Sequence, residues 1–355
     1  MENLVTPAFW RGRRVFLTGH TGFKGGWLAL WLQELGAEVH GFALAPATDP
    51  ALFDVAAVGR GMHSTIGDVR DYPALLAAMQ AAQPEIVFHL AAQPLVPLSY
   101  ETPVDTFATN AMGTVHLLEA CRHVAGIRAI VVVSSDKCYE NREQLWGYRE
   151  TDPMGGHDPY SASKGCTELI VASYRRAFLA AAGIQLASAR AGNVIGGGDW
   201  TPSRLVPDVL AAFTAGEPVT LRSPGAIRPW QHVLEPLSGY LQLAERLVDE
   251  GAAFADGWNF GPDETDARSV AWVVQQLAEG WGPAAHWASA ATPQVHEAHT
   301  LKLDCTKARV RLGWRPHWRA DEAVARSLAW YQARQNGADM HRYTLDEIAA
   351  FGSNS

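Results

Sequence analysis

Short apolar runs alternate with amphipathic stretches throughout the first half of the chain. The apolar runs lie at residues 13–19, 37–44, 85–92 and 129–135. Runs that are apolar almost from end to end are typical of parallel strands buried on both faces. The stretches between them have helical patterns at residues 24–36, 73–83 and 103–126. This alternation predicts an α/β fold with a doubly wound parallel sheet and helices on both of its faces.

The second half of the chain has a different composition and hydrophobic pattern. Glycines and polar residues gather at 191–204 and predict a loop there. Helical patterns follow at residues 204–216 and 269–281, and a short strand is predicted between them at 218–224. We therefore expect a sheet domain and a smaller C-terminal α/β lobe that holds the substrate. The predicted division is 1–190 with 232–258 returning to it for the sheet domain, and 191–231 with 259–355 for the lobe.

Composition narrows the possible functions. The 355 residues are 48% hydrophobic, and 29 basic and 37 acidic residues give a net charge of −8. This charge argues against a general nucleic-acid-binding protein, although it allows a local cationic pocket. The sequence has no signal-peptide pattern and no apolar run long enough to cross a membrane. Four scattered cysteines without a Cys-x-x-Cys pair predict neither disulfides nor a metal site, and they favour a cytoplasmic location.

A glycine-rich turn separates the first predicted strand from the first predicted helix. Its glycines, Gly19, Gly22 and Gly25, would let the backbone approach a pyrophosphate at a helix N-terminus. This context favours a Rossmann-type NAD-binding domain over an ordinary glycine-rich turn. The loop also contributes Phe23 and two large polar residues, His20 and Lys24. Lys24 can offset phosphate charge, whereas His20 either crowds the pyrophosphate or points to solvent.

The second strand lacks the acid that usually binds the adenosine ribose about 20 residues beyond the glycines. Ala43 stands near that place, Asp49 comes too late, and no arginine is placed for a 2′-phosphate. The choice between NAD and NADP is therefore open at this strand. Further cofactor contacts are expected at later strand ends. They are Asp68 and Val69 near the adenine, Ala91, Ala92 and Gln93 near the nicotinamide half, and Asn110.

Tyr160 and Lys164 are four residues apart, which places them on one face of a predicted helix. A free tyrosine titrates near ~10, and a nearby ammonium group would lower the pKa of Tyr160. The pair can then take a proton from a sugar hydroxyl while a nicotinamide takes the hydride. The alternative is a chance pair on the surface. The preceding glycine turn, and a strand that ends in two serines, favour catalysis.

Asp136 and Lys137 stand side by side after the strand at 129–135, where they form either a catalytic acid–base pair or a structural ion pair. Together with the other motifs, they give the chain a specific resemblance. It resembles the extended short-chain dehydrogenase/reductases, a family of nucleotide-sugar epimerases and dehydratases. Within this family, it resembles the CDP-glucose 4,6-dehydratases most strongly. The motifs that carry the resemblance are TGHTGFKGG, GDVRD, HLAAQP, SSDKCY, YSASK, RAGNVIGGGDW, RPWQHV and LKLDCTKARVRLGWRP.

The resemblance implies a catalytic set of Ser135, Asp136, Lys137, Tyr160 and Lys164. Epimerases of the family need only the hydroxyl residue, the tyrosine and the lysine, whereas dehydratases add an acid and a base. In the implied reaction, Tyr160 and NAD⁺ oxidise C4, Lys137 removes the C5 proton, and Asp136 protonates the departing C6 hydroxyl. A base must be partly neutral and an acid protonated, so we expect burial to shift the pKa values of Lys137 and Asp136 accordingly.

The resemblance also implies a nucleotide-sugar site. Its expected residues are Asn193, Arg204, Leu205 and Arg228, and Arg228 suits a diphosphate because a guanidinium can bind two oxygens at once. His232 is either a ligand contact or a packed core residue. CDP is favoured by similarity alone, so a dTDP-, GDP- or UDP-sugar dehydratase or epimerase stays open, as does a non-catalytic cofactor sensor.

Assembly and pathway are implied by the resemblance as well. The long helices that contain Asn110 and Tyr160 usually pair between subunits in the family, which suggests a homodimer or a tetramer. They can also simply face their own sheet. The implied role is deoxysugar biosynthesis for a bacterial surface polysaccharide such as lipopolysaccharide.

Overall fold

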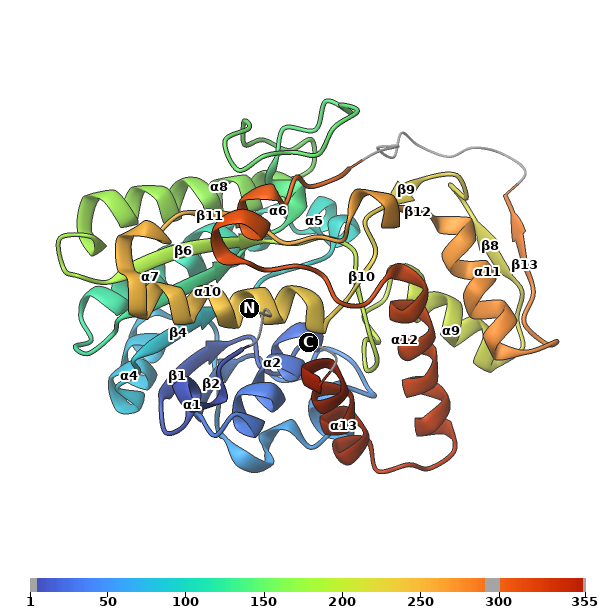
Figure 1. Ribbon diagram of the computed structural model, residues 1–355, viewed down its shortest axis with the longest axis horizontal. Coiled ribbons are helices and arrows are strands. Elements are labelled where there is room, and N and C mark those ends of the chain that lie inside the picture. The colour runs from blue at the N-terminus through green and yellow to red at the C-terminus, as the bar shows by residue number, and fades with distance from the viewer. Residues whose placement is uncertain (1–4, 291–300, 354–355) are drawn as a thin grey trace.

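The computed structural model describes residues 5–290 and 301–353. Its centre is a seven-stranded parallel sheet in the order β3-β2-β1-β4-β5-β6-β11 (Figure 1). The strands are β1 Arg14–Thr18, β2 Glu38–Ala43, β3 His63–Ile66, β4 Ile86–His89, β5 Ala129–Val133, β6 Gln185–Arg190 and β11 Gly257–Asn259. The predicted doubly wound α/β fold of Rossmann type is confirmed.

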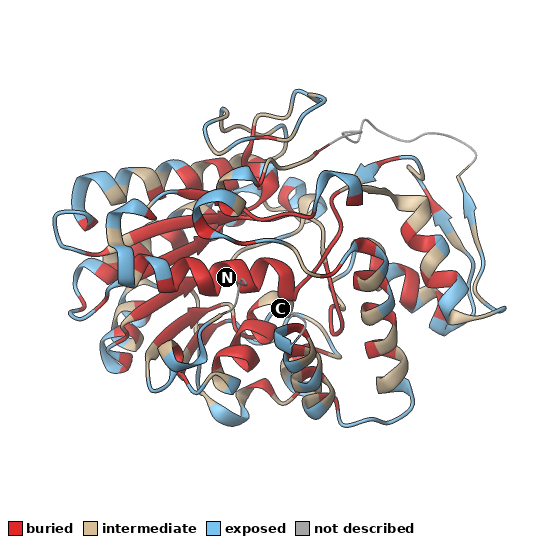
Figure 2. Ribbon diagram, in the orientation of Figure 1, coloured by how far each residue is buried: buried red, intermediate tan, exposed pale blue. Residues whose placement is uncertain are grey.

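Alternate residues of each central strand enter opposite cores. On β1, Val15 and Leu17 join one buried cluster, and Phe16 joins the other. On β5, Val131 belongs to the first cluster and Val132 to the second. Because the side chains of a strand point alternately to its two faces, apolar residues at every position require cover on both sides. Figure 2 shows this burial along the central strands.

Helices supply that cover. The cluster around Phe16 is completed by α4 Tyr72–Ala82, α7 Gly113–Arg122 and α8 Pro159–Tyr174. The cluster around Leu17 is completed by α2 Phe23–Glu34 and α10 Leu234–Glu250. The helix expected at 103–126 runs from α6 Pro103–Phe107 through a π-helical segment, Ala108–Met112, into α7. Single π-helical turns of this kind are frequent at functional sites.

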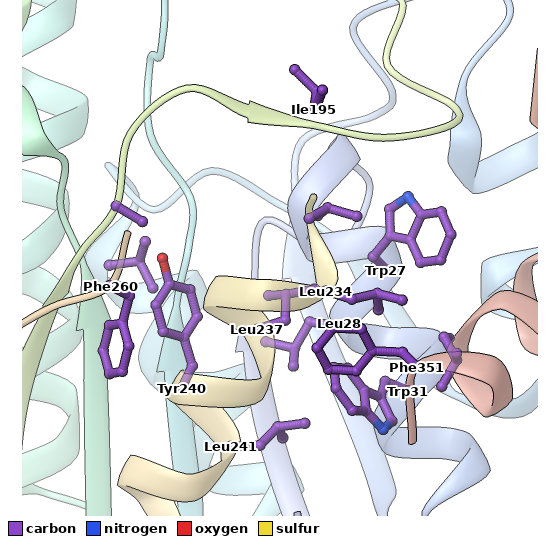
Figure 3. Packing of buried hydrophobic residues seen from close by; sticks show 14 of the residues in the cluster. Trp27, Leu28, Trp31, Ile195, Leu234, Leu237, Tyr240, Leu241, Phe260 and Phe351 are labelled. Atoms are coloured by element: carbon purple, nitrogen blue, oxygen red, sulfur yellow. The ribbon is translucent and has the colours of Figure 1, made fainter. Parts of the chain in front are cut away.

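Side chains of α10 meet side chains of α2 in the larger core. Figure 3 shows Leu234 and Leu237 of α10 beside Leu28 of α2, and Tyr240 beside Phe260. The rings of Tyr240 and Phe260 meet edge to face, with their centroids 5.5 Å apart. Phe260 follows β11 and donates its N–H to the carbonyl of Arg190 at the end of β6, so this contact holds α10 near the carboxyl ends of β6 and β11.

The remaining elements lie mainly in the smaller lobe. The loop expected at 191–204 contains one short strand, β7, which pairs with β10. The lobe elements are β7 Val194–Ile195, α9 Leu205–Ala215, β8 Val219–Leu221, β9 Ile227–Arg228, β10 Gln231–His232, β12 Arg268–Ser269, α11 Val270–Trp281, β13 Trp287–Ser289 and α12 Ala320–Gln335. Short helices lie elsewhere at α1 Pro7–Trp10, α3 Leu52–Val55 and α5 Val96–Glu101. The domain boundaries given above stay a prediction.

The C-terminal segment returns to the sheet domain. It forms α13 Met340–Ser353, which packs against α2 of the sheet domain rather than against the substrate lobe alone. The rings of Phe351 on α13 and Trp31 on α2 lie 5.6 Å apart (Figure 3). Across residues 5–290 and 301–353, no helix combines the length and the apolar character needed to cross a membrane.

The strand order reverses between β1 and β4, its immediate neighbour. The chain leaves β1 toward β2 and β3 on one side, and it leaves β4 toward β5 and β6 on the other. Loops after these two strands therefore diverge and leave a crevice at their carboxyl ends. In open α/β sheets, this is the place where ligands bind.

Candidate active site

The turn after β1 is as tight as the backbone allows. Gly19 has a φ of +80°, and a Cβ there would lie 2.8 Å from the backbone nitrogen of Ala91. A Cβ on Gly25 would lie 2.0 Å from the carbonyl oxygen of Gly19. Gly22 has an ordinary φ of −83° and no such close neighbour. Two of the three predicted glycines are therefore required by packing in the structure.

The same turn suits a pyrophosphate. Gly22 is the N-cap of α2, and no side chain of the described residues caps this helix end. The first amide groups of α2 thus carry the partial positive charge of a helix N-terminus without a competing side-chain acceptor. A close-packed glycine cradle with uncapped amides fits the diphosphate of a dinucleotide.

His20 does not point to solvent, so that alternative is wrong. The side chain is buried, and its Nε2 lies 2.7 Å from the hydroxyl of Ser64 on β3. It packs over Gly41 of β2, where a Cβ would come within 2.5 Å of the ring. Burial lowers the pKa of His20 to about 4, so the imidazole is neutral near pH 7. Its expected crowding of a pyrophosphate stays a prediction.

The strand ends expected near the adenosine carry no free acid. Ala43 ends β2 as a buried residue. Asp68 follows β3, but its carboxylate accepts hydrogen bonds from the backbone and guanidinium of Arg70 at 2.6–2.8 Å. These bonds keep the pKa of Asp68 below its usual value. Val69 is buried and packs against Gly113 of α7. Their contact with an adenine stays a prediction.

Asn110 lies in the π-helical segment and clamps the loop after β4. Its side-chain oxygen accepts from the backbone N–H of Gln93 at 2.8 Å, and its amide donates to the Gln93 carbonyl at 3.0 Å. The amide also reaches the hydroxyl of Ser163 on α8 at 2.8 Å. The clamp holds the half-buried Ala91 and Ala92 at the crevice. The side chain of Asn110 is already used in hydrogen bonds to protein groups. Asn110 therefore positions the loop that borders the expected cofactor site.

The helix α8 begins where its sequence indicates. Asp158 is the N-cap and accepts from the N–H of Ser161 at 2.8 Å, and Pro159 occupies the first helical position. Tyr160 and Lys164 are both buried on the face of α8 that meets the sheet. The Nζ of Lys164 donates to the carbonyl of Val133 at 3.4 Å.

The pKa of Tyr160 moves opposite to the expectation from sequence. Burial raises the pKa of Tyr160 to about 12, and the charge of Asp136 adds to the rise. The Ser135 hydroxyl and the Arg204 guanidinium lower it only in part. The pKa of Lys164 falls to about 8, because burial disfavours its charged form. In this structure desolvation sets the direction of the shift at Tyr160, against the lowering that was expected from a neighbouring ammonium group.

A single 3₁₀ turn at Asp136–Cys138 follows β5 after Ser134 and Ser135. Ser135 caps this turn, with its hydroxyl accepting from the N–H of Lys137 at 3.2 Å and donating to Asp136 at 2.9 Å. Asp136 is buried against Gly192, where a Cβ would lie 1.8 Å from the carboxylate. The turn thus presents its acid to the protein interior.

Lys137 is exposed, so its expected burial is wrong. The short 3₁₀ turn sends consecutive side chains in different directions: Asp136 and Cys138 face inward, and Lys137 between them faces outward. No salt bridge joins Asp136 and Lys137 in the described part of the chain, which removes the alternative of a structural ion pair. Lys137 is accessible to a substrate that approaches from solvent.

Lys24, in the first turn of α2, joins this acid–base cluster. Its Nζ lies 3.5 Å from the hydroxyl of Tyr240 on α10. Burial and the nearby Arg204 and Lys164 lower the pKa of Lys24 to about 7, and Asp136 opposes this shift. The ammonium group of Lys24 is therefore near the predicted catalytic residues. Sequence reasoning missed Tyr240, which had no motif to signal it.

The expected substrate residues lie on the smaller lobe or at its border. Asn193 has a left-handed φ of +47°, and its carbonyl accepts from the N–H of Gln231 at 3.2 Å. Arg204 is the N-cap of α9 and donates to Asp199 at 3.1 Å, and Leu205 is the first residue of α9. Arg228 lies on β9 and pairs with β12. Of these four residues, the structure shows only Arg204 acting electrostatically on Tyr160 and Lys24.

His232 is a packed core residue. Its ring is buried between Trp27 and Trp318, with centroid separations of 5.8 and 4.8 Å. Burial lowers the pKa of His232 to about 3, so it stays neutral. The alternative role as a ligand contact is not supported by this position.

Among the described residues, one cluster could supply three metal ligands, and it lies away from the site. Glu38 and His40 on β2 face His63 on β3, near the amino ends of these strands. The two imidazoles are stacked, with their planes 17° apart and their centroids 4.7 Å apart. Nearly parallel rings cannot both direct an in-plane lone pair at one ion, so this arrangement does not point to a metal centre.

Comparison with known proteins gives a consistent result. A family model described as GDP-mannose 4,6 dehydratase matches residues 16–327. A CDP-glucose 4,6-dehydratase from Salmonella typhimurium is 52% identical over 99% of this chain and 99% of that protein.

Solved structures agree in fold. A UDP-glucose 4-epimerase from Stenotrophomonas maltophila with bound NAD covers 92% of this chain and 100% of that one, with a TM-score of 0.79 and 24% identity. A double mutant of dTDP-glucose 4,6-dehydratase from Streptomyces venezuelae with NAD bound covers 92% and 99%, with a TM-score of 0.76 and 22% identity.

Replacing Gly19 with alanine should weaken NAD⁺ binding by about tenfold or more, because the new Cβ would push the turn away from Ala91. Gly126→Ala is the matched control. Gly126 has a φ of +87° and no neighbour within 4 Å, so it carries the same backbone cost without a clash. Isothermal titration calorimetry with NAD⁺ would check both variants. Equal affinities for the two variants would contradict this account of the cradle.

Proposed function

Since this chain belongs to the GDP-mannose 4,6 dehydratase family, we propose that it removes water from CDP-glucose in an NAD-dependent reaction. The product is CDP-4-keto-6-deoxy-D-glucose, and the enzyme is a hydro-lyase. The observation that supports this proposal is the turn Asp136–Cys138, in which an exposed lysine follows a buried acid that acts electrostatically on Tyr160. The 52% identity to a CDP-glucose 4,6-dehydratase supports the choice of nucleotide.

The residues present fit the cofactor. Gly19 and Gly25 shape the cradle, the first amides of α2 receive the pyrophosphate, and Ala91 and Ala92 border the nicotinamide half. The chemistry that NAD⁺ supplies when bound is uptake of a hydride from C4 of the sugar and its return to C6. The cofactor is NAD, although the residue at the end of β2, Ala43, carries no carboxylate for the adenosine ribose.

Tyr160 takes the proton of the C4 hydroxyl. Its phenol has a raised pKa in a buried setting, so it needs positive charge close by to act near neutral pH. Arg204 supplies part of this charge. Ser135 lies beside the phenol and orients the same hydroxyl by hydrogen bonding.

Lys137 and Asp136 then remove water. Oxidation at C4 acidifies the proton on C5, and Lys137 takes this proton from the side that is open to solvent. Asp136 gives its proton to the C6 hydroxyl as it leaves, from a buried position that keeps bulk water out. Lys137 then returns a proton to C5 when the hydride reaches C6, which completes the 4-keto-6-deoxy product. Two proton-transfer pairs, one for oxidation and one for elimination, distinguish this site from that of an epimerase.

The experiment that tests the function is mass spectrometry of the purified protein with a panel of nucleotide sugars, with and without added NAD⁺. We expect CDP-glucose to lose one water and UDP-, GDP- and dTDP-glucose to stay intact. Water loss from another sugar alone would keep the mechanism and overturn the CDP assignment. Isomerisation without water loss would instead support an epimerase, and no change with cofactor bound would support a sensor.

Two variants separate the halves of the reaction. Tyr160→Phe should reduce turnover by about 100-fold or more, because it removes the group that starts oxidation. Lys137→Met should lose water formation but still oxidise C4, so reduced nicotinamide should accumulate. Absorbance spectroscopy during a single turnover checks this difference. Tyr100→Phe, at an exposed tyrosine, is the control and should behave like the unaltered protein. Full activity in Tyr160→Phe would contradict the mechanism.

We further infer a homodimer, formed through α6, α7 and α8. Large apolar side chains stand exposed on α6, on α8 and on the π-helical segment between α6 and α7. They are Val104 at 79% exposure, Met112 at 48% and Leu169 at 63%. Exposed apolar side chains gathered on one surface mark interaction sites. A tetramer is the alternative assembly, and the cytoplasmic location stays a prediction.

Leu169→Glu should convert the dimer to a monomer, because it would bury a charge in the apolar contact. Sedimentation velocity analysis measures the change. Val310→Glu alters a side chain that is also exposed but lies in another part of the chain, and it should leave the dimer intact. A dimer that persists in Leu169→Glu would place the interface elsewhere.

A further inference from the structure

A buried ion pair lies directly beneath the catalytic helix. Glu168 on α8 accepts from Arg190 on β6 at 2.6 Å, and the two side chains are only 4% and 5% exposed. Tyr160, Lys164 and Glu168 follow one another at intervals of four residues, so they form one stripe on the inner face of α8. The ion pair therefore continues the line of catalytic side chains into the core.

Glu168 holds the segment that precedes the catalytic turn. One carboxylate oxygen accepts from the hydroxyl of Ser134, the residue before Ser135. The other accepts from the hydroxyl of Ser188 at 2.7 Å as well as from Arg190. Both oxygens are thus used, and both tie α8 to the ends of β5 and β6.

Arg190 holds the segment that follows the same turn. Its Nη1 donates to the hydroxyl of Tyr139 at 2.6 Å and to the carbonyl of Glu150 at 3.2 Å. Tyr139 comes immediately after Cys138, the last residue of the turn. Its hydroxyl also donates to Asn259 on β11 at 2.7 Å. The two partners of one ion pair therefore hydrogen-bond to the chain on both sides of Asp136 and Lys137.

We propose that the Glu168–Arg190 pair is a positioning device that fixes the elimination residues Asp136 and Lys137 relative to the oxidation residues on α8. This inference rests on the proposed function, since it assigns the two residue pairs to two steps of one reaction. Glu168 and Arg190 touch neither substrate nor cofactor in this role. They act through Ser134 and Tyr139, which bound the catalytic turn.

Stability alone is a weak reason for this pair. A buried ion pair loses its hydration, and apolar residues of similar size often stabilise a core equally well. A charged pair whose carboxylate oxygens are all hydrogen-bonded can orient its partners, because hydrogen bonds set direction as well as distance. Apolar contacts set distance alone. Here the hydrogen bonds run to the two residues that flank the turn.

The charge of Glu168 has a consequence that can be measured at Lys164. Burial lowers the pKa of Lys164 to about 8, and Glu168 and Cys138 oppose this shift. Lys24 from α2 and the neutral His89 from β4 also feel the charge of Lys164. Removing the charge of Glu168 should therefore lower the pKa of Lys164 further, so that it loses its proton at a lower pH.

The chain allows this pKa to be observed directly. It has five lysines, at positions 24, 137, 164, 302 and 307. In protein labelled with ¹³C-lysine, the Cε signals can be followed against pH by NMR without substrate, and Lys164→Arg assigns the signal of Lys164. Glu168→Gln should lower the pKa of Lys164 by about one unit or more. It should also move the alkaline limb of the pH–rate profile to lower pH by the same amount.

Glu245→Gln is the matched control. Glu245 is also buried and accepts from Thr6 and Trp10, at a place that none of the site residues contacts. It should change thermal stability but leave the pKa of Lys164 and the pH–rate profile in place. An unchanged Lys164 titration in folded Glu168→Gln would overturn the electrostatic part of the proposal.

Tyr139→Phe removes one hydrogen bond between Arg190 and the end of the turn. It leaves Glu168 paired with Arg190, so it still tests the proposal if Glu168→Gln fails to fold. It should leave the pKa of Lys164 unchanged and slow elimination more than oxidation, so reduced nicotinamide should accumulate during turnover. Turnover equal to the unaltered protein, without accumulation, would overturn the proposal. These tests use whichever nucleotide sugar the unaltered protein dehydrates. Failure of the unaltered protein on every sugar would count against the proposed function, and the NMR titration would still decide the role of Glu168.

Discussion

The burial of the central sheet on both faces is the constraint from which the rest of the structure follows. Val15 and Phe16 are neighbours in sequence, yet they belong to two separate cores. Neither core can form unless helices return across both faces, and this forces parallel strands whose carboxyl ends share one edge. The crevice between β1 and β4, the glycine turn and the catalytic turn after β5 all lie at that edge. The site is therefore a consequence of how the apolar strands are covered.

Desolvation governs the chemistry at that edge. The pKa of Tyr160 is raised and those of Lys24 and Lys164 are lowered, and burial is the largest cause in each case. Each shift favours the uncharged form of its group. Lys24 and Lys164, with pKa values of about 7 and about 8, thus have neutral and charged forms close in free energy near neutral pH, whereas Tyr160 stays protonated. A modest change of local charge can then move protons among the members of this cluster, which proton-transfer catalysis requires.

Much of this could be predicted from sequence, because it depends on local pattern. Strand alternation, the N-cap at Asp158 and the close-packed Gly19 and Gly25 involve neighbours in sequence or a repeated motif. The burial of His20, the exposure of Lys137 and the raised pKa of Tyr160 could not be predicted in this way. They depend on residues far along the chain, such as Ser64 beneath His20. The helix α13 was missed for a similar reason, since its mixed sequence is stabilised by packing against α2.

The two proton-transfer pairs impose a geometric requirement that loops alone would not meet. Oxidation acts at C4 of the sugar and elimination at C5 and C6, so the reacting atoms are adjacent. Catalytic groups need placement to within about 0.5 Å, which is finer than the freedom of an untethered turn. Tyr160 is fixed by a helix, whereas Asp136 and Lys137 stand on a single 3₁₀ turn. Hydrogen bonds from that helix to both ends of the turn fix the turn residues relative to Tyr160, so that the two sets of catalytic residues are positioned together. Glu168, on the same helical stripe as Tyr160, is positioned to supply them together with Arg190.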